Sequence, residues 1–200
     1  MVKDTIFDRQ IPKDKLPGTD NNIFIIAEKF CKFGQNIKSQ KMERIAVFPG
    51  SFDPFTLGHE AIVRRAMDLF DKIIIAIGIN PDKKFMFPIE KRKEWIEKIF
   101  AGENKISVDT YSSLTVDYCR SIGAKYILRG LRTSSDFEYE RLIGQVNRQL
   151  GNNDIETVYL LTLPEHTFIS SSVVREILNY NGDISKFVPQ VIVDDVIRHK

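Results

Sequence analysis

Residues 48–59 read FPGSFDPFTLGH, and this stretch decides the fold because a different regular pattern lies on each side of it. Residues 44–48 form a short run rich in apolar and β-branched side chains, which predicts a buried strand. After the stretch, apolar residues recur at the spacing of one helix face: Ile62, Ala66, Leu69 and Phe70. Two prolines and two glycines in between prevent the strand from continuing into the helix. We therefore expect a strand, a turn and a helix, with His59 at the start of the helix.

A turn of this kind suits a bound anion. The first N–H groups of a helix have no partner within the helix, and its dipole is positive at this end. Gly50 and Gly58 leave room for a phosphate near the backbone, while Ser51 adds a hydroxyl and His59 an imidazole. An ordinary loop with a solvated histidine explains the same residues equally well, so the turn alone does not establish a phosphate site.

From Arg44 onward, strand patterns alternate with helical patterns. Further strands are expected at residues 72–79, 105–109, 124–128 and 157–161. Helices are expected at residues 88–100, 136–150, 171–179 and 190–197, with one more around Tyr118 and Cys119. This alternation predicts an α/β fold with an open five-stranded parallel sheet, doubly wound, with helices on both faces.

The same patterns predict which side chains face the interior. In the helix after Pro88 these are Ile89, Lys93, Ile96 and Phe100, and in the helix that begins at Asp136 they are Ile143, Val146 and Leu150. Trp95 is expected to pack in the core, and Ser113 to cap the helix that carries Cys119.

Polar and glycine residues follow every predicted strand. They lie at residues 50–51, 80–84, 112–115, 129–132 and 166–172. Ligands of open parallel sheets bind beyond the carboxyl ends of the strands. We therefore expect these segments to line one shared cleft.

The composition excludes several classes of protein. The chain has 200 residues and a net charge of +2, which is too small to indicate binding to nucleic acid or to a membrane. Its two cysteines, Cys31 and Cys119, make neither a disulfide framework nor a metal site. We see no apolar run of about 18 residues that would span a membrane and no secretory signal. We therefore expect a cytoplasmic protein.

Residues 1–42 differ from the rest of the chain. They contain turn formers such as Pro12 and Pro17, and one apolar patch at residues 23–27. We expect a flexible, poorly structured N-terminal extension over residues 1–42, followed by one domain over residues 43–200. Translation from Met42 is an open alternative, and a targeting or regulatory role for the extension is a less favoured one.

Three separated motifs resemble the bacterial phosphopantetheine adenylyltransferases, a family of the nucleotidyltransferase superfamily. TLGH at residues 56–59 matches the superfamily's T/HxGH signature. RGLR at residues 129–132 is followed by DFEYE at 136–140, and FISSSVVR occupies residues 168–175. The resemblance runs from about Arg44 to the C-terminus, and three motifs in this order are highly specific. It implies the Rossmann-like nucleotidyltransferase fold.

The resemblance implies adenylyl transfer from ATP to 4′-phosphopantetheine, which gives dephospho-coenzyme A and pyrophosphate. The attacking phosphate oxygen is already ionised, so catalysis needs positioning and electrostatic stabilisation rather than a general base. Mg²⁺ is expected to arrive with ATP, held by phosphate oxygens and water. The chain has neither a P-loop motif nor the dinucleotide-binding glycine motif after its first strand.

The resemblance also implies roles for single residues. His59, Lys83 and Arg132 are expected to act in catalysis, and Ser51, Lys83, Thr115 and Arg129 to bind 4′-phosphopantetheine. The residues expected to bind ATP are Ser51, Phe52, His59, Gly130, Leu131, Arg132, Glu140, His166, Thr167, Phe168, Ile169, Ser170, Ser171 and Ser172. No residue is expected to bind a metal directly.

Structural roles compete with several of these assignments. Arg129 and Arg132 can equally form salt bridges with Asp136 or Glu140, and the three serines can simply supply a helix cap. Phe85 stands where the family often has proline, a difference that we expect to change only the stiffness of the loop.

Two other functions stay open. One is an adenylyl- or cytidylyltransferase for another acceptor such as nicotinate mononucleotide, which the RGLR and DFEYE motifs disfavour. The other is a non-catalytic nucleotide-binding module, which His59, Lys83 and Arg132 together disfavour. By resemblance we also expect a homohexamer and feedback inhibition by coenzyme A, with neither nucleic acid nor membrane as a partner.

Overall fold

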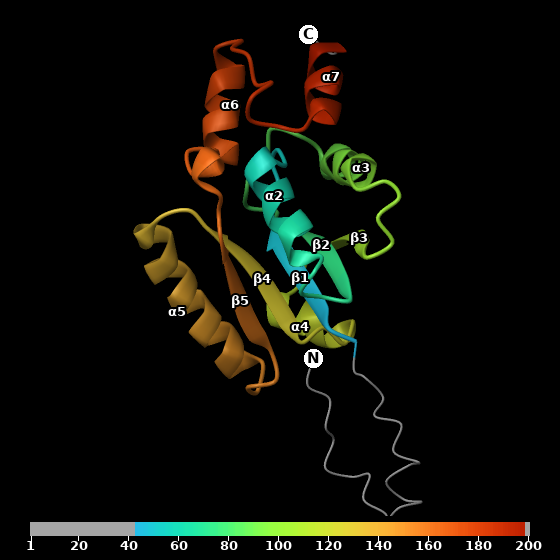
Figure 1. Ribbon diagram of the computed structural model, residues 1–200, viewed down its shortest axis with the longest axis vertical. Coiled ribbons are helices and arrows are strands. Elements are labelled where there is room, and N and C mark those ends of the chain that lie inside the picture. The colour runs from blue at the N-terminus through green and yellow to red at the C-terminus, as the bar shows by residue number, and fades with distance from the viewer. Residues whose placement is uncertain (1–42, 199–200) are drawn as a thin grey trace, which may run out of the picture. The chain divides into compact units, whose positions relative to one another are not determined.

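The computed structural model describes residues 43–198, so the expectations for residues 1–42 concern residues outside the described part. Five strands form one parallel sheet in the order β3-β2-β1-β4-β5 (Figure 1). The strands are β1 (Ile45–Gly50), β2 (Lys72–Gly78), β3 (Ile106–Tyr111), β4 (Tyr126–Leu131) and β5 (Glu156–Leu161). This confirms the predicted α/β fold with an open parallel sheet.

Helices connect the strands and extend the chain beyond β5. They are α2 (Leu57–Ala66), α3 (Ile89–Ile99), α4 (Thr115–Ser121), α5 (Ser134–Leu150), the short 3-10 helix η2 (Pro164–His166), α6 (Ser171–Asn179) and α7 (Gln190–Arg198). Among residues 43–198, no helix has the length and apolar character needed to cross a membrane. The strand order reverses between β1 and β4, and open sheets bind their ligands at such a switch point.

Alternate residues of the central strands enter two separate hydrophobic clusters. Ala46 and Phe48 of β1 lie in a cluster with residues of α2 and α3, whereas Val47 lies with residues of α4. In β2 the first cluster takes Ile73, Ile75 and Ile77, and the second takes Ile74 and Ala76. Both faces of the sheet are therefore covered, which explains why these strands read as continuous apolar runs. The first cluster includes residues of α6 and α7, which lie beyond the carboxyl ends of the strands in Figure 1.

Some expectations about single side chains are wrong. Leu69 lies after the end of α2 and is 43% exposed. In α3, Lys93 is only partly buried, and Arg92 takes the interior position beside Trp95. Ser113 does not cap α4, because Leu114 occupies the N-cap position and no side chain caps the helix.

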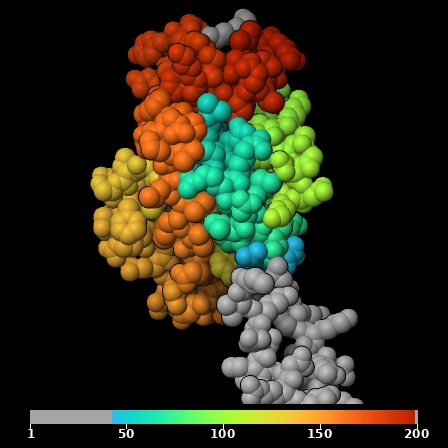
Figure 2. Space-filling model, viewed as in Figure 1, coloured from blue at the N-terminus to red at the C-terminus, as the bar shows by residue number. Residues whose placement is uncertain are grey.

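Helix α5 contradicts the sequence prediction most clearly, because none of its residues is buried. Ile143, Val146 and Leu150 were expected inside but are 37%, 53% and 45% exposed. Phe137, Tyr139 and Leu142 are exposed as well. Figure 2 shows α5 along one edge of the described part of the chain. Its apolar stripe is real, but the described residues of one chain do not bury it.

Candidate active site

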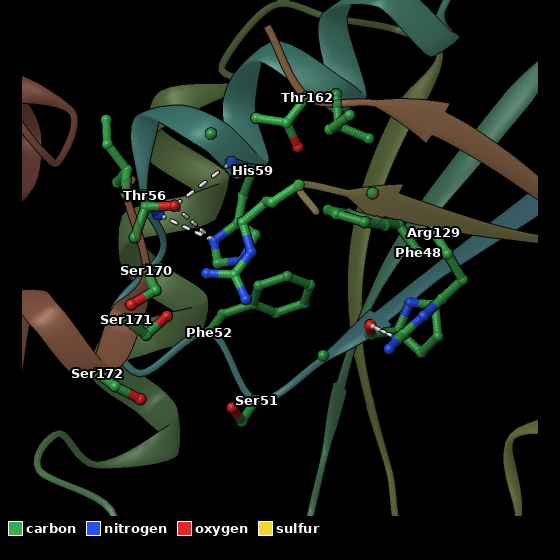
Figure 3. Close-up of a pocket in the computed structure, with 17 residues that line it drawn as sticks. Phe48, Ser51, Phe52, Thr56, His59, Arg129, Thr162, Ser170, Ser171 and Ser172 are labelled. Carbon is green, nitrogen blue, oxygen red and sulfur yellow. Dashed lines mark hydrogen bonds between the residues drawn. The ribbon is translucent and has the colours of Figure 1, made fainter. Parts of the chain in front are cut away.

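A cleft of about 330 Å³ lies where β1, β4 and β5 end and where α2 and α6 begin (Figure 3). The predicted site residues that line it are Ser51, Phe52, His59, Arg129, Gly130, Arg132, Ile169, Ser170, Ser171 and Ser172. Three motifs that are far apart in the sequence therefore meet at one place, as the sheet topology predicts.

Thr56 and His59 cap the first turn of α2 reciprocally (Figure 3). The Thr56 hydroxyl accepts a hydrogen bond from the His59 backbone N–H at 3.4 Å, and His59 Nδ1 accepts one from the Thr56 backbone N–H at 3.0 Å. Because Nδ1 is an acceptor, the neutral ring carries its proton on Nε2. His59 can therefore offer an Nε2–H donor to a ligand in the cleft.

Three phenylalanine rings surround the imidazole of His59. The ring centroids of Phe48, Phe52 and Phe55 lie 6.2, 5.2 and 5.3 Å from that of His59. This burial, together with the positive charges of Arg132 and Arg129, lowers the pKa of His59 to about 4. His59 is therefore neutral at physiological pH and contributes a hydrogen-bond donor rather than a charge.

The turn between β1 and α2 has no room for a side chain at Gly50. A Cβ there would lie 2.7 Å from the ring of Phe52, which is 3% exposed and packs on Phe48 and Phe55. Phe52 itself takes the left-handed conformation, with a φ of 47°. The turn thus buries an aromatic ring while the backbone of Gly50 stays open to the cleft.

Arg129 and Arg132 line the cleft from the end of β4, and each pairs with a carboxylate of α5. Arg129 Nε donates to Glu140 at 2.8 Å, its Nη2 donates to the same carboxylate, and its Nη1 donates to the carbonyl of Pro49 at 3.0 Å. Arg132 Nε donates to Asp136 at 3.1 Å. The salt bridges considered as an alternative are therefore present, and they orient guanidinium groups that remain partly exposed.

The three serines at the start of α6 differ in their contacts. Ser170 is the N-cap of α6, and its hydroxyl accepts a hydrogen bond from the backbone N–H of Val173 at 3.2 Å. For this residue, the alternative role as a helix cap is therefore confirmed. Ser171 donates to the carbonyl of Pro54 at 2.9 Å and ties α6 to the turn after β1. Ser172 is exposed at the edge of the cleft.

Two smaller hollows adjoin the cleft at Gly50. Lys83 lines one of them together with Ser51, in a volume of about 240 Å³. Thr115 lines the other together with Arg129, in a volume of about 210 Å³. The cationic side chains therefore open onto neighbouring spaces that share residues with the main cleft.

Not every predicted residue lines these spaces. Leu131 is 5% exposed, Phe168 is 63% exposed, and neither these two nor Thr167 contributes to the cleft walls. His166 lies behind Gly58: its Cβ is 3.7 Å from where a Cβ of Gly58 would be. Its Nδ1 is buried without a hydrogen-bond partner among the described residues.

Sequence reasoning missed several residues of the cleft. Thr162, which follows β5 directly, is one of them, and the rule that sites lie beyond strand ends points to it. Thr56 has the residue type preferred at an N-cap, but its partner at the third helical position is a histidine instead of the usual Glu or Gln.

Among residues 43–198, no group of three or more His, Cys, Asp or Glu residues is arranged to hold a metal ion.

Comparisons with known proteins agree on one family. The family model described as cytidylyltransferase-like matches residues 47–177. A phosphopantetheine adenylyltransferase of Flavobacterium psychrophilum is 51% identical over 149 residues, which cover 74% of this chain and 97% of the relative. One of Bacteroides fragilis is 50% identical over 147 residues, which again cover 74% and 97%.

Solved structures agree on the fold. The structure of Plasmodium falciparum nicotinic acid mononucleotide adenylyltransferase complexed with NaAD matches with a TM-score of 0.59 and covers 78% of this chain and 96% of that one. Its sequence is 19% identical. At that identity the match supports the nucleotidyltransferase fold and leaves the acceptor undecided.

Proposed function

The chain belongs to the cytidylyltransferase-like family and, within it, to the phosphopantetheine adenylyltransferases, and from this membership we propose how its residues carry the reaction. The protein transfers the adenylyl group of ATP to 4′-phosphopantetheine, a step of coenzyme A biosynthesis. An oxygen of the acceptor phosphate forms a bond to the α-phosphorus of ATP. The bond from that phosphorus to the bridging oxygen breaks, and pyrophosphate leaves.

His59 stabilises the transition state as a neutral donor. Its Nε2–H faces the α-phosphate, where negative charge builds up during the transfer. The observation that carries this assignment is the 3.0 Å hydrogen bond from the Thr56 N–H to Nδ1, because it fixes both the tautomer and the direction of the ring. A histidine with a pKa of about 4 is also a poor general base at neutral pH, which suits a nucleophile that is already ionised.

The positive charge comes from three other side chains. Arg132 lines the main cleft beside His59 and neutralises the phosphates of ATP during catalysis. Lys83 and Arg129 line the adjoining hollows and hold the acceptor phosphate with the help of the Ser51 hydroxyl. Thr115 lines the hollow next to Arg129 and contacts the pantetheine arm.

ATP occupies the main cleft between the turn after β1 and the start of α6. Ser51 and Phe52 form the wall at the β1 turn, Gly130 forms the floor, and Ser170 to Ser172 bind the triphosphate. A Cβ on Gly130 would approach Ile62 to 3.2 Å, so the floor is already closely packed. The remaining ATP contacts are assigned to Leu131, Glu140, His166, Thr167, Phe168 and Ile169.

Mg²⁺ enters with ATP and supplies further charge neutralisation when bound. We assign its ligands to phosphate oxygens and water.

The protein acts in the cytoplasm, as a homohexamer in which the apolar side of α5 is covered by a neighbouring subunit. Coenzyme A shares the pantetheine arm and the adenine nucleotide of the product, so it occupies the same cleft and inhibits the enzyme.

The choice of acceptor is tested by pyrophosphate release. Purified protein is given ATP and Mg²⁺ with either 4′-phosphopantetheine or nicotinate mononucleotide. We expect turnover with the first and none with the second. Turnover with nicotinate mononucleotide alone contradicts the assignment, and ATP binding without pyrophosphate release from either acceptor indicates a non-catalytic module.

A further inference from the structure

Arg92 of α3 is buried to 2% exposure, although the sequence pattern placed the neighbouring Lys93 on the inner face of this helix. Arginine is rarely buried unless its charge and its N–H groups are satisfied. None of the roles given to the cleft residues so far involves Arg92. Its contacts lead to the site, however. One is made to the turn after β1, which lines the cleft, and the others are made to the segment that lines the adjoining hollow with Lys83.

The guanidinium of Arg92 bridges the turn after β1 and the segment between β2 and α3. Nη1 donates to the carbonyl of Ser51 at 2.5 Å, and Nε donates to the carbonyl of Phe87 at 3.0 Å. The ring of Phe85 lies against the same group, with its centroid 4.2 Å from Cζ of Arg92. Phe85 therefore does more than change the stiffness of its loop: it forms one wall of the arginine site.

Asp53 ties the same two segments together from the other side. Asp53 is 2% exposed, and its carboxylate accepts hydrogen bonds from the backbone N–H groups of Met86 and Phe87, both at 2.9 Å. Burial lowers the pKa of Arg92, and the negative charges of Asp53 and Glu90 act in the opposite direction. Two buried, oppositely charged residues thus fasten one loop to one turn.

The fastened loop carries Lys83. We name residues 79–88 the Lys83 loop; it has no helix or strand of its own, and Lys83 itself is exposed. Lys83 and Phe85 line the same small hollow as Ser51. The distance between the lysine and the serine therefore depends on how firmly the loop is attached to the turn.

We propose that Arg92 is a positioning residue for the acceptor phosphate, which holds the Lys83 loop against the turn so that Lys83 and Ser51 face the same anion. The proposal rests on the acceptor-binding roles given above to these two residues. Arg92 does not touch the substrate. It acts through the Ser51 carbonyl and through the loop, with Phe85 and Asp53 as its supports.

The test compares Arg92→Lys with the wild-type enzyme in steady-state kinetics. Lysine keeps the charge but cannot bond to two carbonyls in the fixed geometry of a guanidinium. We expect the KM for 4′-phosphopantetheine to rise about tenfold, the effect of losing one or two buried hydrogen bonds, while the KM for ATP stays within about twofold. Backbone amides of residues 82–87 should exchange hydrogen faster than in the wild type.

Variants of Phe85 test the same proposal in case Arg92→Lys does not fold. Phe85→Leu removes the ring and leaves the guanidinium and its hydrogen bonds in place, so it should raise the acceptor KM by a smaller factor. Phe85→Tyr keeps an aromatic ring at this position, so its KM for the acceptor should equal that of the wild type. Arg64→Lys is the matched control, because Arg64 also lies over a phenylalanine ring, that of Phe100 at 5.3 Å, but outside the Lys83 loop.

A double variant separates positioning from a general loss of stability. If Arg92 acts through Lys83, then Arg92→Lys adds less than about threefold to the acceptor KM when Lys83→Ala is already present, because coupled residues are not additive. Equal effects in both backgrounds, or equal rises in the KM values of both substrates, overturn the proposal. A wild-type enzyme without turnover of 4′-phosphopantetheine contradicts the proposed function instead.

Discussion

The backbone N–H of Thr56 donates to Nδ1 of His59 across 3.0 Å, and this single hydrogen bond determines which nitrogen of the imidazole carries the proton. It holds the ring at the start of α2 with Nε2–H as the remaining donor. The surrounding rings and the two arginines keep the ring neutral. The histidine of the TLGH motif is thus prepared as a donor before any ligand arrives.

The protonation state of His59 is open to direct measurement. We expect the ¹⁵N spectrum of the ligand-free protein at pH 6 to show His59 as a neutral imidazole with its proton on Nε2, because its pKa is about 4. The signal is assigned by its loss in His59→Asn. A doubly protonated ring at pH 6 contradicts the environment described here.

The lowered pKa of His59 also makes the free energy of unfolding depend on pH. An unfolded histidine titrates near pH 6.5 and the folded His59 at about 4, so the unfolded state binds more protons between these values. The neutral His59 ring therefore makes its full contribution to the free energy of unfolding above about pH 6.5. This contribution is lost as the pH falls toward 4.

Urea unfolding at pH 7.5 and pH 5 measures this loss. Between the two values the wild type should lose up to about 2 kcal/mol more than His59→Asn. Identical losses in the two proteins show that His59 does not carry the effect.

Besides the contact with ATP assigned to it above, Glu140 is expected to act on acceptor binding through Arg129. Its carboxylate holds the guanidinium from one side while the Pro49 carbonyl holds it from the other. Glu140→Gln weakens this pair, and the acceptor KM should rise about tenfold. Glu138→Gln is the matched control, since Glu138 pairs with Arg141 on the same helix and does not line the cleft. Equal effects of the two variants exclude a specific role for Glu140.

The exposed side of α5 predicts the behaviour of the assembly. Leu142 and Val146 are 54% and 53% exposed and line none of the hollows described above. Leu142→Glu combined with Val146→Glu should lower the mass measured by light scattering, because a buried carboxylate at a subunit contact is strongly unfavourable. Arg141→Glu on the same helix, which replaces one charge by another, should leave the mass nearer that of the wild type. An unchanged mass in the double variant shows that α5 is not a subunit contact.

The sequence predicted the fold because its strands are covered on both faces. Residues 72–79 read as a continuous apolar run, which is typical of a strand in a parallel sheet that helices cover on both faces. It predicted the place of His59, Arg129 and Arg132 because strand ends and helix starts are marked by glycine, proline and serine.

The rest depended on contacts that a linear pattern does not contain. Helical periodicity identifies an apolar stripe, but it does not say whether the same chain buries it, and α5 therefore misled the prediction. Arg92 was missed because the helical pattern placed Lys93, one residue further along, on the inner face. No sequence pattern shows that the Arg92 guanidinium is satisfied by two carbonyls and an aromatic ring. The low pKa of His59 also depends on three rings that only the folded turn brings together.

The most direct test of the account measures kcat and the ATP dissociation constant of His59→Ala. A donor that acts mainly in the transition state should lower kcat by roughly 10²–10⁴-fold when it is removed, while ATP binding changes by less than about threefold. His59→Asn, which keeps an N–H donor, should recover part of the loss. Equal losses in turnover and in ATP affinity for His59→Ala would contradict the account, since they would make His59 a binding residue only.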